Sequence, residues 1–233
     1  AEAGARPQRR FSLPVALAGL AFAGVTSFPT QLFDAETRKV KPTPNLTTLA
    51  RAAERLAAAG RANIEINAPG TTSTEILAML ANAGATQIEP GHGLTGTTPL
   101  HVFEDLPEDP AVVYLSEVSH RIGEEAFCFG GGLYIDPVFP DYPLRAIVSP
   151  APTSSRQALK PVEIPGAAAI DYYGMIQPDG GARPQVGDSV VFGFRPQAFV
   201  TRAYTVGVSG LSRGAAKVEG IYDAFGRLAD WPL

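Results

Sequence analysis

The sequence predicts an α/β plus β protein, with part of a parallel (β/α) barrel in residues 1–105 and a mainly antiparallel β-domain in residues 106–233. In the first part, apolar strand-like segments alternate with turns and with stretches of helical composition. After Leu100, short β-rich runs separated by turn residues replace this alternation. An acidic, proline-containing linker at 104–110 marks the boundary between the two parts.

The barrel part contains three strand–helix units, whose strands fall around 20–28, 62–67 and 86–89. A closed barrel of this type takes eight strands, and soluble proteins avoid the unpaired strand edges that a partial barrel leaves. We therefore expect the second part of a (β/α)8 barrel, and hence a fragment of a longer polypeptide. A naturally shortened protein and a half that assembles with another chain are the alternatives.

The β-domain is expected to consist of short β-rich runs separated by turn signals, such as Pro-Asp-Gly-Gly at 178–181. The runs are Ala111–Val118, Ala126–Ile135, Leu144–Val148, Ser189–Phe194, Ala198–Val208 and Ala216–Tyr222.

The most informative segment is 86–99, in which a strand-like approach ends in Glu89 and is followed by a turn rich in glycine and threonine. Glycines at 91, 93 and 96 let backbone N–H groups approach an oxyanion, and threonines at 95, 97 and 98 can donate hydrogen bonds to phosphate. Pyridoxal phosphate suits this combination, because its pyridine nitrogen needs an acidic partner. A glycine-rich turn without a ligand is the alternative.

A second polar turn follows the preceding strand and contains Gly70, Thr71, Thr72 and Ser73. In a parallel (β/α) barrel, phosphate groups are commonly held by loops that follow neighbouring strands. We therefore expect this turn and the segment from Gly91 to Thr98 to face the same ligand.

The Glu-Pro-Gly sequence at 89–91 resembles a motif of the fold-type III pyridoxal-phosphate enzymes, the alanine racemase and ornithine decarboxylase group. The chain is more closely similar to the YhfX-like family of alanine-racemase-type proteins, over nearly all of residues 18–228. The resemblance implies that Glu89 faces the pyridine nitrogen and that Gly91 and His92 bind the phosphate. The segments that carry it are Gly24–Pro29, Ile66–Pro69, Glu89–Leu100, Ser116–Arg121, Cys128–Gly132 and Gly187–Asp188.

This resemblance implies a pyridoxal-phosphate-dependent amino-acid enzyme, racemase-like or lyase-like, that acts through a carbanion at the substrate α-carbon and is a homodimer at full length. Glu89 weakens the case for alanine racemisation, because alanine racemases of this fold have an arginine there. The family carries its Schiff-base lysine on the first barrel strand, a position that no lysine of this chain occupies, so we expect the isolated chain to be inactive. A non-catalytic protein that binds pyridoxal phosphate or another phosphate ligand is the alternative.

The β-domain contains several candidate catalytic groups, of which His120, Cys128 and Tyr134 are the leading ones. His120, with Arg121 beside it, follows an apolar strand where a positive group can meet a substrate carboxylate. Cys128 matches a cysteine of the decarboxylase branch that takes part in protonation, and Tyr134 is a plausible phenolic acid or base, as are tyrosines 172 and 173. The alternatives are a solvent-facing pair at a strand end for His120 and packing roles for the cysteine and the tyrosines.

Composition and charge exclude several other classes of protein. The net charge is −4 and the basic residues are scattered, which argues against nucleic-acid binding. A single cysteine excludes an internal disulfide. The three histidines lack the spacing of a metal site, so we expect no metal.

The N-terminal segment is compatible with two interpretations. Arg9 and Arg10 precede an apolar run from Leu13 to Val25, a pattern typical of signal peptides, including twin-arginine ones. The alternative is a basic loop leading into a buried parallel strand, which the similarity of Gly24–Pro29 to the YhfX-like family favours. We therefore expect a cytoplasmic protein with no membrane span.

Overall fold

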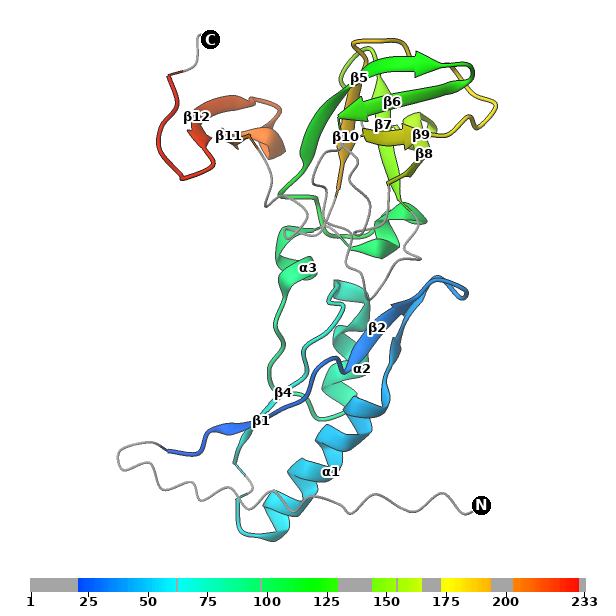
Figure 1. The fold of residues 1–233 in the computed structure, drawn as a ribbon. Helices are drawn as coiled ribbons and strands as arrows, with labels where there is room; N and C mark the ends of the chain where they lie inside the picture. Colours follow the sequence, from blue (N-terminus) through cyan, green and yellow to red (C-terminus); the bar gives the residue numbers. More distant parts are fainter. Residues whose placement is uncertain are drawn as a thin grey trace.

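The computed structural model describes residues 21–61, 63–96, 98–129, 144–153, 155–164, 173–193 and 203–230. Figure 1 shows helices α1 and α2 and strands β1 to β4 at one end of the molecule and strands β5 to β10 at the other, with α3 between them. The signal-like segment at 9–20 lies outside the described residues. No helix in the described part of the chain combines the length and the apolar composition needed to cross a bilayer.

The N-terminal part is built on a small parallel sheet. Strand β1 (Gly24–Thr26) pairs in parallel with β4 (Glu65–Asn67), and a parallel bridge between Asn67 and Gln87 adds a third strand position. Helix α1 (Pro44–Ala58) separates the first two positions, and the 3₁₀ helix η1 (Thr74–Ile76) with α2 (Leu77–Asn82) separates the next two. All three predicted strand positions are confirmed, but the described residues form no (β/α)8 barrel.

Helix α1 begins where its sequence provides a cap. Thr43 accepts a hydrogen bond from the backbone N–H of Asn45 at 3.2 Å, and Pro44 occupies the first turn, where its missing N–H costs nothing. Leu49 on this helix is buried with residues from the loop after β4 and from η1 and α2. The cluster comprises Leu49, Ala68, Ile76 and Leu80.

Strands β2 (Gln31–Asp34) and β3 (Lys39–Pro42) form an antiparallel hairpin between β1 and α1. The sequence predicts no strands in this segment. The turn is held by Asp34, which accepts hydrogen bonds from the backbone N–H and the hydroxyl of Thr37 and forms an ion pair with Lys41 at 3.2 Å. These hydrogen bonds, and then the neighbouring Lys41, lower the pKa of Asp34 to about 2.

The C-terminal part contains a closed barrel of six antiparallel strands in the order β10-β5-β6-β9-β8-β7. The predicted antiparallel β-domain is thus confirmed, and closure removes the strand edges that an open sheet would expose. The strands are β5 (Tyr114–Ile122), β6 (Glu125–Phe129), β7 (Arg145–Ser149), β8 (Leu159–Glu163), β9 (Tyr173–Ile176) and β10 (Ser189–Phe192).

The barrel interior is filled by side chains that alternate along each strand, as the pleat requires. Small residues such as Ala126, Cys128 and Ala146 share the interior with Phe192, the largest fully buried side chain among the described residues. A separate hairpin follows the barrel, formed by β11 (Tyr204–Ser209) and β12 (Lys217–Asp223), with the short 3₁₀ helix η5 (Leu211–Arg213) in its turn.

Candidate functional site

Three polar side chains meet where the parallel strands end. Thr26 is the last residue of β1, Asn67 is the last of β4, and Glu89 follows the strand position at Gln87. The Asn67 amide nitrogen Nδ2 donates to Thr26 Oγ1 at 3.1 Å and to Glu89 Oε1 at 2.6 Å. Ligands of parallel α/β sheets bind at this carboxyl edge, so the group has the position of a binding site.

Asn67 fixes one oxygen of the Glu89 carboxylate, and Glu89 as a whole is exposed. The amide oxygen Oδ1 of Asn67 is buried without a hydrogen-bond partner among the described residues. A buried acceptor without a donor is costly, so a donor from a ligand would stabilise this arrangement.

The loop after β4 and the loop after Glu89 are in direct contact. The hydroxyl oxygen of Thr72 accepts a hydrogen bond from the backbone N–H of Gly93 at 3.1 Å, within the short helix α3 (Gly91–Thr95). Thr71, Thr72 and Ser73 are all buried, as is His92 on α3. The structure therefore brings together the two loops that the sequence expected to face one ligand.

Ser73 is the polar group of these loops that lacks an internal partner. The residue is 2% exposed, and its hydroxyl oxygen makes no hydrogen bond within the described part of the chain. Since buried polar groups are nearly always satisfied, this hydroxyl is available to an acceptor such as a phosphate oxygen.

The glycines of the two loops have different roles. A methyl group on Gly70 would lie 2.3 Å from the backbone oxygen of Gln31. A methyl group on Gly96, whose φ is +65°, would lie 2.1 Å from the backbone oxygen of Asp109. Both glycines are therefore required by packing. A methyl group on Gly91 would meet nothing within 4 Å, so Gly91 leaves open space beside Glu89.

The threonines of the second loop are partly used within the protein. The Thr95 hydroxyl donates to the backbone oxygen of Gly91 at 3.1 Å. Thr98 accepts from the backbone N–H of Leu100 at 3.2 Å and caps the 3₁₀ helix η2 (Pro99–Val102) together with His101. Thr97 lies outside the described residues. To bind phosphate, Thr95 and Thr98 would have to break these internal hydrogen bonds and form new ones with the phosphate oxygens.

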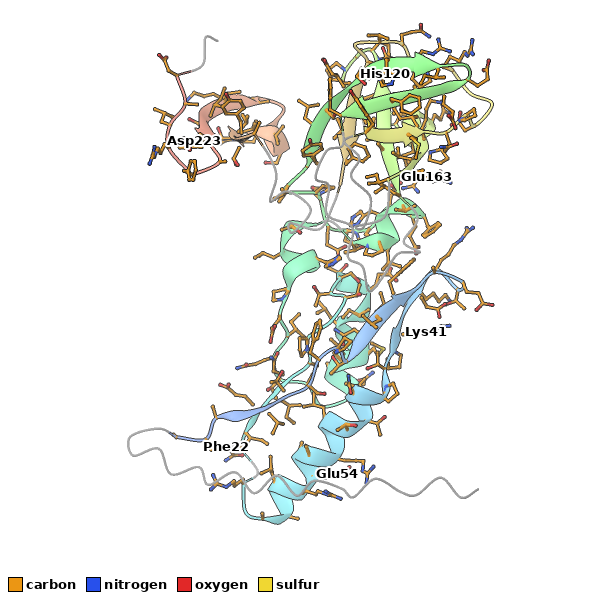
Figure 2. All side chains as sticks on the ribbon, viewed as in Figure 1. Phe22, Lys41, Glu54, His120, Glu163 and Asp223 are labelled. Carbon is orange, nitrogen blue, oxygen red and sulfur yellow. The ribbon has the colours of Figure 1, made fainter. Side chains whose placement is uncertain are left out.

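His120 lies on the barrel strand β5, where Figure 2 labels it. Its ring stacks on Phe127 with centroids 4.6 Å apart and meets the edge of Tyr173 at 5.0 Å. Ser119 Oγ lies 2.9 Å from its Nδ1. Within this chain His120 is thus part of an aromatic cluster on the barrel, and these contacts do not include Glu89.

Cys128 faces the barrel interior and is completely buried. Burial raises the pKa of its thiol to about 11, although a hydrogen bond from the Gly174 backbone acts in the opposite direction. A catalytic cysteine needs an accessible thiolate, so this geometry favours the packing role. Tyr134 and Tyr172 lie outside the described residues.

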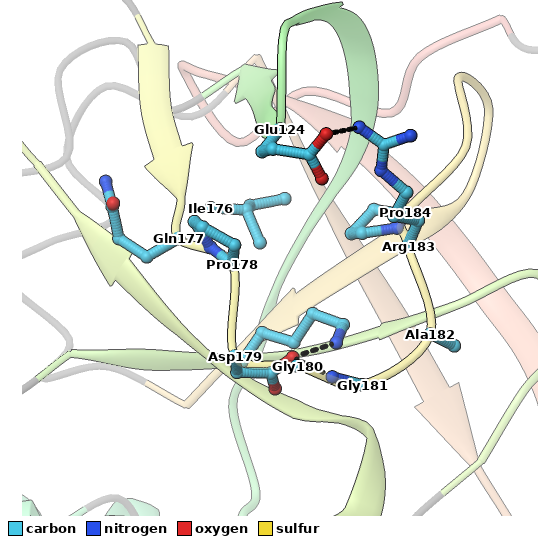
Figure 3. Close-up of a pocket in the computed structure, with 11 residues that line it drawn as sticks. Glu124, Ile176, Gln177, Pro178, Asp179, Gly180, Gly181, Ala182, Arg183 and Pro184 are labelled. Atoms are coloured by element: carbon cyan, nitrogen blue, oxygen red, sulfur yellow. Dashed lines mark hydrogen bonds and ion pairs between the residues drawn. The ribbon is translucent and has the colours of Figure 1, made fainter.

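A second polar feature is a pocket lined largely by the loop between β9 and β10 (Figure 3). A cavity of about 250 Å³ is lined by Lys160, Asp179 and Arg183 among other residues. The buried Lys160 ammonium pairs with Asp179 Oδ1 at 2.8 Å, and Arg183 pairs with Glu124. These pairs neutralise the charges of the cavity and join the 177–184 loop to β8 and to the turn between β5 and β6.

Sequence reasoning did not select Asn67 or Thr26 as site residues. A usable signal was present, because Val25-Thr26 and Ile66-Asn67 each place a polar residue directly after an apolar strand position. Reading each strand end in register, instead of searching for glycine-rich turns alone, would have identified both residues.

Comparison with known proteins identifies relatives of the chain. A model of the YhfX-like, C-terminal domain family matches residues 113–218. The chain is also 41% identical over 210 residues to the Escherichia coli (strain K12) protein named "Uncharacterized protein YhfX". This match covers 90% of the chain and 52% of the relative, so the chain spans about half the length of the curated relative it matches.

We predict that the Cys128 thiol is unreactive in the folded chain. At pH 8 a thiol-specific chromogenic reagent should react roughly a hundredfold more slowly with the folded chain than with the chain in denaturant, because raising the pKa by about two units lowers the thiolate fraction by that factor. Since Cys128 is the only cysteine, the signal is unambiguous. Rapid stoichiometric labelling of the folded chain would instead support a catalytic role.

Proposed function

The chain belongs to the YhfX-like family, and we propose that its two strand-end loops supply the cofactor site of a pyridoxal-phosphate-dependent amino-acid enzyme, racemase-like or lyase-like. The observation that carries this proposal is the contact between Thr72 and Gly93, which joins both loops beside the Glu89 carboxylate. A phosphate site and a carboxylate at one strand edge are the two features that this cofactor needs.

The residues present fit the cofactor. The phosphate would be held by Ser73, whose buried hydroxyl is unpaired, with Thr71, Thr72 and His92 around it. The open space beside Gly91 gives room for a bound group. Pyridoxal phosphate supplies an electron-withdrawing ring that stabilises a carbanion at the α-carbon of an amino acid. Glu89 would keep the pyridine nitrogen protonated.

Asn67 would position Glu89 for this task. Its amide nitrogen bridges Glu89 and Thr26, so the carboxylate is held from β4 and β1 at once.

In this proposal the three parallel strand positions are the second part of a (β/α)8 barrel. The remaining strands and the lysine that holds the cofactor covalently would come from further polypeptide, since the relative is about twice as long as the match. We propose that the full-length protein acts on an amino-acid substrate, forms a homodimer and is located in the cytoplasm. The isolated chain is proposed to be inactive.

The second candidate is a non-catalytic protein that binds pyridoxal phosphate or another phosphate ligand. It is favoured by the positions of the four lysines, none of which lies on β1 or β4 or in the loops that follow them. Lys39 and Lys41 lie on the β2–β3 hairpin (Figure 2), Lys160 lies in the barrel and Lys217 lies on β12.

We predict that Gly91→Val abolishes retention of pyridoxal phosphate by the chain, because the side chain would fill the space where the ligand is expected. Equilibrium dialysis with the cofactor measures this. Gly193→Val is the matched control, since Gly193 after β10 also has open space around its α-carbon. Wild-type affinity in the Gly91 variant would refute the site.

We predict that Glu89→Gln, in a polypeptide extended to the length of the relative, slows α-proton exchange of its amino-acid substrate by roughly 10²–10³-fold. Cofactor affinity should change little, because Glu89 is expected to act on the ring nitrogen and not on the phosphate. Exchange in D₂O over a panel of amino acids, followed by NMR, gives the readout. Unchanged exchange in the variant would remove Glu89 from the mechanism.

We also predict that borohydride reduction of the chain mixed with pyridoxal phosphate yields no stoichiometric adduct on any lysine. None of the four lysines lies on β1 or β4 or in the loops that follow them, so we expect none to present an amine to a cofactor bound there. Peptide mapping after reduction measures the outcome. A full-yield adduct on one lysine would mean that the chain carries its own catalytic amine and that the fragment interpretation is wrong.

A further inference from the structure

The linker between the two parts of the chain lies against the candidate site. The backbone N–H of Ala111 donates to the oxygen of Thr95 at 2.8 Å, and His101 Nε2 lies 3.2 Å from the backbone oxygen of Glu108. Gly96 approaches Asp109 so closely that a methyl group would not fit between them. The linker is therefore packed on the segment that contains α3 and η2.

Glu108 extends from this linker to the other loop of the site. One carboxylate oxygen accepts the backbone N–H of Thr74, and the other accepts the Thr74 hydroxyl at 3.0 Å. Partial burial raises the pKa of Glu108, but the hydrogen bonds from Thr74, and then the nearby His101, outweigh it and lower the pKa overall. The carboxylate thus remains ionised and forms charge-assisted bonds at neutral pH.

Thr74 follows directly after the buried run from Thr71 to Ser73. Its backbone N–H lies at the start of η1, where no helical carbonyl is available to it. Glu108 satisfies this group from outside the loop. Glu108 therefore holds the 71–73 loop at its C-terminal end. In this conformation Ser73 is buried and its hydroxyl has no partner among the described residues.

The barrel contacts both the linker and the preceding 3₁₀ helix η2 through Arg156. Arg156, in the 3₁₀ helix η3 (Arg156–Ala158) between β7 and β8, donates to the backbone oxygens of His101 and Val102 at 3.3 and 3.2 Å. It also pairs with Asp105 at 3.0 Å. A continuous set of contacts thus runs from the barrel through the linker to the loop.

We propose that Glu108 is a positioning residue for the 71–73 loop, and that through Glu108 and Arg156 the β-barrel controls the affinity of that loop for its ligand. The identity of the ligand rests on the function proposed above, with the phosphate of pyridoxal phosphate as the group that the loop holds. Glu108 acts through Thr74 and does not itself touch the ligand.

Two variants and one control test this assignment on the whole chain. Glu108→Ala removes both acceptors, and Glu108→Gln keeps the shape of the side chain while removing its charge. Glu104→Ala is the matched control, because Glu104 is an exposed acid of the same linker whose carboxylate makes no hydrogen bond within the described residues. Circular dichroism confirms that each variant is folded.

The readouts are amide hydrogen exchange over 71–76 and the dissociation constants for pyridoxal phosphate and inorganic phosphate. We expect Glu108→Ala to accelerate exchange at Thr74 at least tenfold and to weaken both ligands roughly tenfold or more, since hydrogen bonds to a charged group are the stronger ones. Glu108→Gln should have a smaller effect in the same direction. Arg156→Ala should also weaken both ligands, and Glu104→Ala should change neither readout.

Unchanged exchange at Thr74 in both Glu108 variants would overturn the positioning role, whatever the loop binds. Faster exchange with unaltered ligand affinity would overturn the link between Glu108 and the site. If the wild-type chain binds neither probe, the proposed cofactor site fails and the control of affinity fails with it. The exchange data would then still report separately whether Glu108 holds the loop.

Discussion

The candidate site depends on a buried polar contact between the start of β2 and the loop after β4. A buried loop must satisfy its backbone groups, and here Thr30 and Gln31, both fully buried, provide the partners. Thr30 donates to the oxygen of Pro69 from both its backbone N–H and its hydroxyl, and Gln31 Nε2 donates to the oxygen of Ala68 at 3.3 Å. The backbone oxygen of Gln31 accepts in turn from Thr71. The β2–β3 hairpin therefore fixes the path of the loop on which the site is built.

The two parts of the chain reach stability by different means, and this separates their roles. The barrel closes on itself, so its strands need no further partner, and its one inward-facing lysine is neutralised by Asp179. The parallel sheet has few strands, and polar side chains are concentrated at its carboxyl edge. Because the barrel needs no partner strands, it can support and position the linker that Arg156 contacts. The polar carboxyl edge of the parallel sheet is the part that we propose binds a ligand.

The sequence predicted the parallel strand positions because each is a short apolar segment ended by glycine, proline or a polar residue, and these signals are local. It did not predict the β2–β3 hairpin, because Lys39, Lys41 and Pro42 have the composition of a loop and the hairpin is stabilised by Asp34 and by the loop after β4. The closed strand order of the barrel could not be predicted either, because pairing between strands that are distant in the chain leaves no local sequence pattern. The packing of His120 against Phe127 and Tyr173 depends on that same pairing.

Glycine content alone is therefore a weak guide to a binding loop. In these two loops, Gly70 and Gly96 are explained by the backbone atoms that approach them, and they would be required even if no ligand ever bound. Gly91 is different, because neither a positive φ nor a close neighbour excludes a side chain there. Gly193 shares both properties, so the open space at Gly91 points to a ligand only together with the Glu89 carboxylate two residues before it. Gly91 has open space around its α-carbon and follows Glu89 by two residues, and Asn67 holds the Glu89 carboxylate in place. This combination of open space and a fixed carboxylate, more than the glycine-rich sequence, makes the strand edge a candidate site.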